Sequence, residues 1–326
     1  MWVFARLRWA VRVHMATTGE PLASEQSELP TNRAEWPRIA LITPVLNSGK
    51  YIEQTIRSVL AQCYPNLDYF IVDGGSTDNT IEVIRKYEKE ISGWISESDS
   101  GMYDALNKGF SRTSGEVMGW ISATDKLHVG GLLSVGDIFR KLPEVEWITG
   151  RPTRFNEEGM MINVDPLPHW TRARFLAGFN HYIQQESTFW RRSLWNKAGS
   201  SLDVTCGMVG DFELWLRFFR YARLYPADII IGGFRVHSSS MGLQQLEECH
   251  RLQEQMIISE LANSPHSLAI RGFRFLDSFI KKIPAIRYAW WRLIERNLPS
   301  LPGPDWPQAI RFDQSRGWYL TNTRGY

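Results

Sequence analysis

Two hydrophobic patterns alternate between residues 38 and 150. Short apolar runs, such as Arg38–Pro44 (RIALITP) and Leu67–Asp73 (LDYFIVD), have the length and composition of buried strands. Between these two runs, Ile52, Ile56 and Val59 recur at the spacing of an amphipathic helix. The same alternation predicts further strands and helices, namely strands at 94–96, 117–122 and 145–149 and helices at 81–87, 103–112 and 132–142.

Regular alternation of strands and helices predicts an α/β fold with a Rossmann-like, mainly parallel sheet flanked by helices. Such sheets bind ligands at the carboxyl ends of their strands. Four acidic residues fall at these ends: Asp73, Glu97, Asp99 and Asp125. Each is also placed to cap the next helix, but like charges gathered at one edge repel unless a cation or a donor-rich ligand compensates.

Composition narrows the choice of ligand. Of 326 residues, 43% are hydrophobic and 22% charged, and the net charge of +2 gives no support to a nucleic-acid partner. Cys63, Cys206 and Cys249 form no CxxC pair and suit a reducing compartment. Neither GxGxxG nor GxxxxGK[ST] is present, so a nucleotide would be held by side-chain carboxylates and a metal.

The N-terminal segment MWVFARLRWAVRVHM lacks the uninterrupted apolar core of a signal peptide, and no apolar run reaches the roughly 20 residues that span a bilayer. We expect residues 1–36 to form a flexible lead-in. Met15 is an alternative start to Met1.

Four motifs then occur in order: TPVLN (43–47), IVDGGSTDNT (71–80), SESDSGMYDALNKG (96–109) and WISATD (120–125). Together they resemble the inverting family 2 glycosyltransferases, over most of the chain. The resemblance implies the GT-A fold and a hexosyltransferase-type enzyme, which moves a sugar from a nucleotide-sugar donor, with UDP-sugars favoured, to the hydroxyl of a saccharide or lipid-linked saccharide acceptor. The domains implied are a catalytic domain at 37–242, with a nucleotide-sugar-binding half at 37–150 and an acceptor half at 151–242, and a helical basic extension at 243–326.

The resemblance also implies donor contacts. Pro44 and Asn47 would lie in the loop that approaches the nucleoside, and Asp73 would accept a hydrogen bond from the base, because a base imide N–H needs an acceptor. The remaining residues implied on the donor side are Asp99, Asn107, Lys108, Thr124 and Arg235.

WISATD occupies the place of the family's metal motif, which commonly has two adjacent acidic residues. Thr124 replaces the first, so Asp125 is the expected ligand of Mg²⁺ or Mn²⁺, and the metal is expected to bind more weakly without donor. His237, in a segment resembling the family's RxH segment, would approach the metal or the diphosphate. A plain helix cap at Asp125 and a structural role for His237 stay open.

For catalysis, the family's general base lies at the start of a helix that matches the segment from Asp211 to Arg217, so Asp211 is the expected base and Glu213 the alternate. Gln185, Glu186 and Trp190 are expected beside the acceptor, although packing explains Trp190 equally well.

The segment 266–299 holds seven basic residues against two acidic ones, with apolar residues at helical spacing, including Leu276 and Ile280. This pattern suits a helix lying on an anionic membrane surface, or equally a helix docked on the catalytic domain.

We therefore expect an enzyme of cell-surface polysaccharide or glycolipid synthesis in the cytoplasm, with peripheral contact to the inner face of the cell membrane. A catalytically silent nucleotide-sugar-binding or scaffold protein is the alternative suggested by Thr124. A nucleotidyltransferase is less favoured, because no Gly- and basic-rich triphosphate loop follows the first strand.

Overall fold

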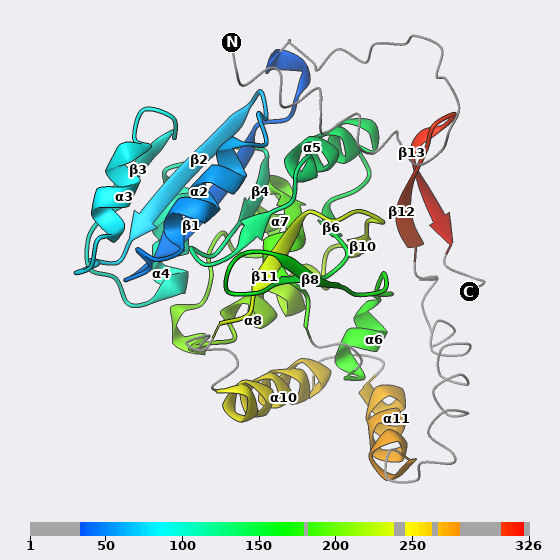
Figure 1. Cartoon of the computed structure of the whole chain (residues 1–326). Coiled ribbons are helices and arrows are strands. Elements are labelled where there is room, and N and C mark those ends of the chain that lie inside the picture. The colour runs from blue at the N-terminus through cyan, green and yellow to red at the C-terminus, as the bar shows by residue number, and fades with distance from the viewer. Residues whose placement is uncertain (1–32, 179–181, 238–244, 263–266, 281–307, 323–326) are drawn as a thin grey trace.

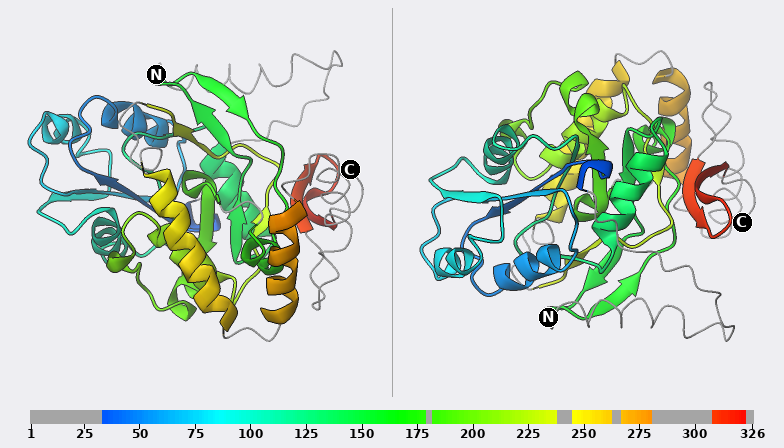
Figure 2. Two further views of the ribbon diagram at one scale, coloured as in Figure 1. Left: turned by 90° about the horizontal axis from the view of Figure 1, so that it is seen from below. Right: turned by 90° about the horizontal axis from the view of Figure 1, so that it is seen from above.

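The computed structural model describes residues 33–178, 182–237, 245–262, 267–280 and 308–322. Within them, a seven-stranded sheet forms the centre and helices cover both of its faces (Figures 1 and 2). The expected lead-in before residue 33, both candidate start methionines and the basic segment 281–299 lie outside the described residues.

The central sheet draws on both halves of the chain. Its strand order is β10-β6-β9-β4-β1-β2-β3, and every neighbouring pair is parallel except the two that β9 makes with β4 and β6. The predicted α/β class with a mainly parallel sheet is confirmed. Its strands are β1 (Ile39–Val45), β2 (Leu67–Asp73), β3 (Gly93–Ser96), β4 (Val117–Trp120), β6 (Trp147–Thr149), β9 (Thr188–Arg191) and β10 (Tyr225–Pro226).

Helices bury one apolar stripe each against the sheet, in two separate cores. In α2 the predicted stripe Ile52, Ile56 and Val59 is completely buried, which explains why this segment is helical. One core is covered by α2 (Ile52–Leu60), α3 (Thr80–Lys86) and α5 (Gly131–Lys141), and the other by α4 (Met102–Ser111), α6 (Arg172–Leu176), α7 (Arg192–Lys197) and α8 (Gly210–Phe218).

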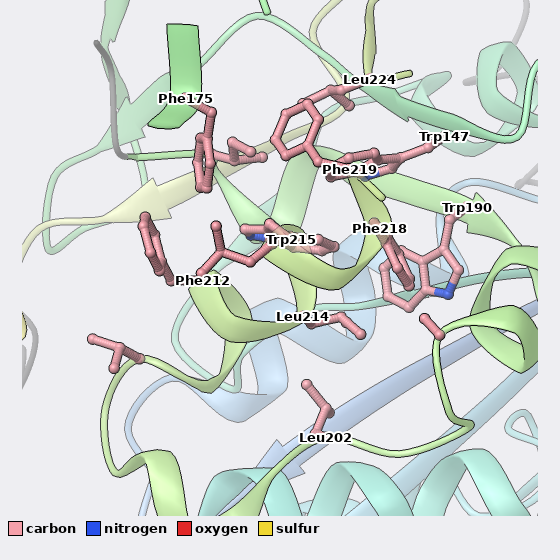
Figure 3. Packing of buried hydrophobic residues seen from close by; sticks show 14 of the residues in the cluster. Trp147, Phe175, Trp190, Leu202, Phe212, Leu214, Trp215, Phe218, Phe219 and Leu224 are labelled. Carbon is pink, nitrogen blue, oxygen red and sulfur yellow. The ribbon is translucent and has the colours of Figure 1, made fainter. Parts of the chain in front are cut away.

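Trp190 belongs to the second core and not to a binding surface. Its ring is completely buried and packs edge-on against Trp120 and Trp215, with centroid distances of 5.4 and 5.7 Å. Figure 3 shows Trp190 and Trp215 in this core. The prediction that Trp190 borders an acceptor is wrong. Strand β9 inserts antiparallel into the sheet, so Trp190 points into the core beneath α8, where aromatic packing stabilises the fold.

A smaller sheet and the C-terminal elements surround this centre. The smaller sheet has the order β5-β11-β7-β8, with β5 (Lys126–Leu127), β11 (Gly232–Arg235), β7 (Thr153–Phe155) and β8 (Met161–Val164). Two helices follow, α10 (Leu246–Ala262) and α11 (Ser267–Ile280). An unpredicted hairpin, β12 (Gln308–Asp313) and β13 (Gly317–Asn322), forms a bridge from Ile310 to Ala227 beside β10. In the described part of the chain, no helix is long and apolar enough to cross a bilayer.

At Gly232, strand β11 packs closely against the backbone of the segment that carries Glu186. A Cβ at Gly232 would lie 2.2 Å from the backbone oxygen of Glu186, so we expect Gly232→Ala to lower the free energy of unfolding by about 1–3 kcal/mol. Urea denaturation measures this. Gly272→Ala in α11 is the matched control, since a Cβ there meets nothing within 4 Å and removes a helical glycine. Equal stabilities of the two variants would contradict the packing.

Candidate active site

Asp73 ends β2 as a completely buried carboxylate. It accepts hydrogen bonds from the backbone N–H groups of Gly75 and Ser76, at 3.1 and 3.0 Å, and from the hydroxyls of Ser76 and Ser96. Three of these four donors reach Oδ2 and one reaches Oδ1. Asp73 therefore stabilises the turn after its strand. Because Oδ1 accepts only one of these bonds, the contact of Asp73 with a nucleotide base stays a prediction.

The loops after β1 and β2 lie against each other at the predicted edge. Pro44 is buried inside β1, whereas Asn47 is exposed, with a φ of +45° and an Oδ1 that accepts a hydrogen bond from Thr77 N–H at 2.8 Å. Asp99 is half-buried above Gly74, where a Cβ would come within 2.6 Å of its Oδ2. Asn47 and Asp99 thus flank the strand ends, where a nucleoside contact is expected.

Two residues of α4 hold loops together. The Nδ2 of Asn107 donates to the carbonyl of Leu202 at 2.9 Å, and its Oδ1 accepts from the N–H of Leu202 at 2.8 Å. Both polar groups of Asn107 thus bond the backbone of Leu202, and the donor contact of this residue stays a prediction. Lys108 pairs with Glu97 and Asp104 and keeps 23% of its side chain exposed, so its donor contact stays a prediction.

Asp125 follows β4 and is 1% exposed. Its Oδ1 accepts a hydrogen bond from the backbone N–H of Arg235 at 2.9 Å, and the Nε2 of Gln185 lies 3.4 Å from Oδ2. Burial raises the pKa of Asp125, against which the N–H and the charge of Arg235 act. A buried carboxylate with one lightly bonded oxygen is well suited to a cation, whose charge compensates this desolvation.

Arg235 is completely buried and its guanidinium is used inside the protein. It donates to the carbonyls of Thr124 and Glu157 and to the Oε1 of Gln54, at 2.5, 2.7 and 3.0 Å. The predicted contact of Arg235 with a diphosphate stays a prediction, and these hydrogen bonds give this side chain a structural role. Arg235 thereby positions the backbone of Thr124 and the carboxylate of Asp125. The side chain of Thr124 is half-buried, and its donor contact stays a prediction.

His237 lies beside α2. Its ring centroid is 5.1 Å from that of Tyr51, and burial lowers its pKa while the charge of Glu157 raises it. No group of three or more His, Cys, Asp or Glu side chains within the described ranges is arranged to hold a metal. Asp125 is thus not part of a three-residue cluster of these ligand types within the described ranges, and metal contact by His237 stays a prediction.

Glu186 is an unusual carboxylate at the centre of this region. It is 1% exposed, and neither of its oxygens makes a hydrogen bond to another described residue. Burial raises its pKa well above the ordinary value, and the charges of Asp125 and Asp211 raise it further. The charges of Asp125, which follows β4, and of Asp211, at the start of α8, thus both act on Glu186 in the turn η2 (Gln185–Ser187).

Asp211 lies in the first turn of α8 and is half-buried. Its Oδ1 accepts hydrogen bonds from the N–H of Phe212 at 2.7 Å and from the hydroxyl of Tyr103 at 3.3 Å. Burial nevertheless raises its pKa to about 6. A carboxylate with this pKa is ionised at neutral pH yet holds a proton better than an exposed aspartate, as a general base requires. Glu213 instead forms a bidentate pair with Arg217, so Asp211 stays the favoured base and Glu213 the alternate.

The raised pKa of Asp211 predicts a pH-dependent stability. The folded protein binds this proton more tightly than the unfolded chain, so the contribution is present below about pH 4 and is lost as pH rises through about 6. Asp211→Asn keeps the group neutral. We expect the variant to exceed the original protein by on the order of 2 kcal/mol at pH 8 and to match it near pH 4. Denaturant unfolding at both pH values checks this; a difference independent of pH would contradict it.

Tyr182 was not predicted. Tyr182 is 57% exposed. Partial burial of its hydroxyl nevertheless raises the pKa of this group, and the charges of Glu186, Asp125 and Asp211 raise it further. Tyr182 therefore borders the carboxylate cluster from the solvent side. Its position two residues before Gln184, in a segment expected beside the acceptor, was the only signal in the sequence.

Comparison with known proteins finds glycosyltransferases among the sequences similar to this chain. The sequence model of Glycosyl transferase family 2 matches residues 40–135. An uncharacterized glycosyltransferase of Rickettsia typhi is 26% identical over 66% of this chain and 70% of its own length. The glycosyltransferase TuaG of Bacillus subtilis, assigned provisionally to teichuronic acid biosynthesis, is 38% identical over 28% of this chain and 37% of its own.

Solved structures show the same fold. Residues 1–349 of TarS from S. aureus, in complex with UDP-GlcNAc, superpose with a TM-score of 0.58 at 15% identity, over 81% of this chain and 82% of that one. The chain spans 43% of the longer TarS structure. The mannosyltransferase PcManGT of Pyrobaculum calidifontis, in complex with GDP-Man and Mn²⁺, gives 0.50 at 14% identity, over 92% and 94% of the two chains.

Proposed function

The chain is a family 2 glycosyltransferase with the GT-A fold, and on that premise we propose that it transfers the sugar with inversion, using Asp211 as the general base. The observation that carries the proposal is the raised pKa of Asp211, a half-buried residue at the start of α8. The charge of Asp211 raises the pKa of Glu186, as does the charge of Asp125. The carboxylates of Asp125, in the first half of the catalytic domain, and of Asp211, in the second half, thereby both act on Glu186.

Inversion needs no covalent intermediate on the enzyme. Asp211 takes the proton of the acceptor hydroxyl, and the oxygen of that hydroxyl forms the new bond to the anomeric carbon. The bond from this carbon to the nucleoside diphosphate breaks on the opposite face. The hydrogen bonds from Phe212 N–H and Tyr103 hold the carboxylate in place for this transfer. The proton ends on Asp211 and the electron pair on the diphosphate.

A divalent metal fits beside Asp125. The lightly bonded Oδ2 of Asp125 and the Oε1 of Gln185, a buried oxygen with no hydrogen bond to another described residue, are hard oxygen ligands of the kind that Mg²⁺ and Mn²⁺ prefer. When bound there with the donor phosphates, such a metal neutralises the charge of the leaving diphosphate. The complex of PcManGT with Mn²⁺ supports this choice.

For the substrates, we propose a nucleoside diphosphate sugar as donor and a saccharide or lipid-linked saccharide of a surface polymer as acceptor. The TarS complex with UDP-GlcNAc and the provisional assignment of TuaG support a UDP-sugar and a cell-surface polysaccharide. Glu186 and Tyr182, on both of which the charge of Asp211 acts, would meet the acceptor together with Gln185, which lies beside Asp125.

A donor screen tests the proposal. UDP-, GDP- and dTDP-sugars are compared by thermal shift with and without Mn²⁺, since a ligand at about 100 times its Kd stabilises the native state by about 2.7 kcal/mol. We expect one donor class to raise the melting temperature only with metal and to be slowly hydrolysed. Binding without hydrolysis or transfer would favour the silent scaffold, and no shift with any donor would contradict the proposal.

A further inference from the structure

Helix α11 is attached to the rest of the protein along one side. The side chain of Ile270 is 3% exposed within the second core, and the guanidinium of Arg274 donates to the carbonyl of Leu176 at 2.8 Å and pairs with Glu254 of α10. Figure 1 shows α11, in orange, at the periphery beside α10 and away from the central sheet. These contacts set the rotation of the helix about its own axis.

The opposite side of α11 is apolar and exposed. Leu268, Phe275, Leu276 and Phe279 have exposed fractions of 84, 64, 51 and 54%, and a Cβ at Gly272 would meet nothing within 4 Å. Positions 268, 272, 275, 276 and 279 are spaced by three or four residues, so they share one helical face. We call these five residues the α11 face. It is a contiguous apolar surface, which soluble proteins seldom expose without a partner.

Charge beside the α11 face identifies its partner. Arg271 is exposed and lies between Leu268 and Phe275 on the helical surface. In the sequence, Lys281 and Lys282 follow the helix directly, and 266–299 carries seven basic residues against two acidic ones. A second protein copy would bring like charges together, whereas an anionic lipid surface accepts both the apolar side chains and the flanking cations.

We propose that the α11 face docks the protein on an anionic lipid surface, inserting Leu268, Phe275 and Phe279 at the level of the headgroups. The membrane-bound helix and the helix docked on the catalytic domain, which were alternatives for this segment, are then both realised by α11. It docks on the catalytic domain through Ile270 and Arg274 and binds lipid through its other side. Of the proposed function, this proposal concerns only the acceptor. A protein held at the membrane encounters a lipid-linked saccharide by diffusion along the membrane surface.

Vesicle flotation with the full chain tests it. The vesicles are phosphatidylcholine alone or with phosphatidylglycerol, and the variants are Phe279→Ser and Leu268→Ser. The matched control is Phe312→Ser in β12, which removes an equally exposed phenylalanine, 57% against 54%, from another surface. We expect binding to anionic vesicles only, at least tenfold weaker for both α11 variants and unchanged for the control.

Two further measurements keep the outcome interpretable. Hydrolysis of the donor in the absence of vesicles is expected to be equal in all variants, so a loss of vesicle binding is separated from a loss of folding or of catalysis. Light scattering without vesicles is expected to give the same mass for all variants. Absent binding, equal binding of all variants, or a dimer that the α11 substitutions dissociate would overturn the proposal.

Discussion

Replacing Asp211 with asparagine is expected to lower turnover by at least about a hundredfold while leaving donor affinity unchanged. Asparagine has the same shape and still accepts the hydrogen bond from Phe212 N–H, but it cannot take the proton of the acceptor hydroxyl. The measurement is steady-state transfer with the donor found by the screen, together with donor affinity by calorimetry. A drop in turnover at constant affinity identifies an interaction made only in the transition state.

Glu213→Gln is the matched control for this variant. It makes the same chemical change two residues further along α8, where the carboxylate pairs with Arg217. We expect turnover within about threefold of the original protein, since exposed or half-exposed i,i+4 pairs contribute little. Near-normal turnover of Asp211→Asn, or an equal loss in both variants, would place the base elsewhere.

Replacing Asp125 with asparagine is expected to lower turnover by roughly a thousandfold, because a metal at a leaving diphosphate contributes several kcal/mol. The asparagine Oδ1 still accepts from the backbone N–H of Arg235, so the loop keeps its position while the site loses one negative charge. We further expect the Mn²⁺ concentration for half-maximal activity to rise at least tenfold, measured by titration of the metal-free protein.

Asp137→Asn serves as the control for Asp125, since Asp137 pairs with Arg140 on the surface of α5. Its metal dependence is expected to match that of the original protein. An Asp125 variant with unchanged activity and unchanged metal titration would rule out Asp125 as the metal ligand.

The fold could be predicted because the central strands β1 and β4 are buried on both faces and β2 nearly so. Runs such as Leu67–Asp73 are continuous and apolar, and β2 has these same bounds. The hairpin β12–β13 was missed although a signal exists: alternating segments flank a turn that ends at Gly317, which has a φ of +71°. Its pairing with the rest of the protein, through Ile310, depends on contacts distant in sequence.

The candidate site was readable where position along an element decides the role. Asp125 follows the end of a strand and Asp211 lies at the start of a helix, and both positions can be predicted from the local sequence pattern. Trp190 was misjudged because its partners in the core, such as Trp215, lie elsewhere in the chain, and the structural partners of Asn107 and Arg235 are equally distant in sequence. An amide, an indole or a guanidinium suits ligand binding and internal packing equally well, and only burial distinguishes the two.

The most direct test of the account is the configuration of the sugar at the moment of transfer. Proton NMR follows hydrolysis of an α-linked donor by the protein and identifies the anomer released before mutarotation equilibrates it. A single base at Asp211, acting opposite the diphosphate, predicts that the β anomer appears first. Initial release of the α anomer would contradict it, since retention requires a different arrangement of groups around the anomeric carbon.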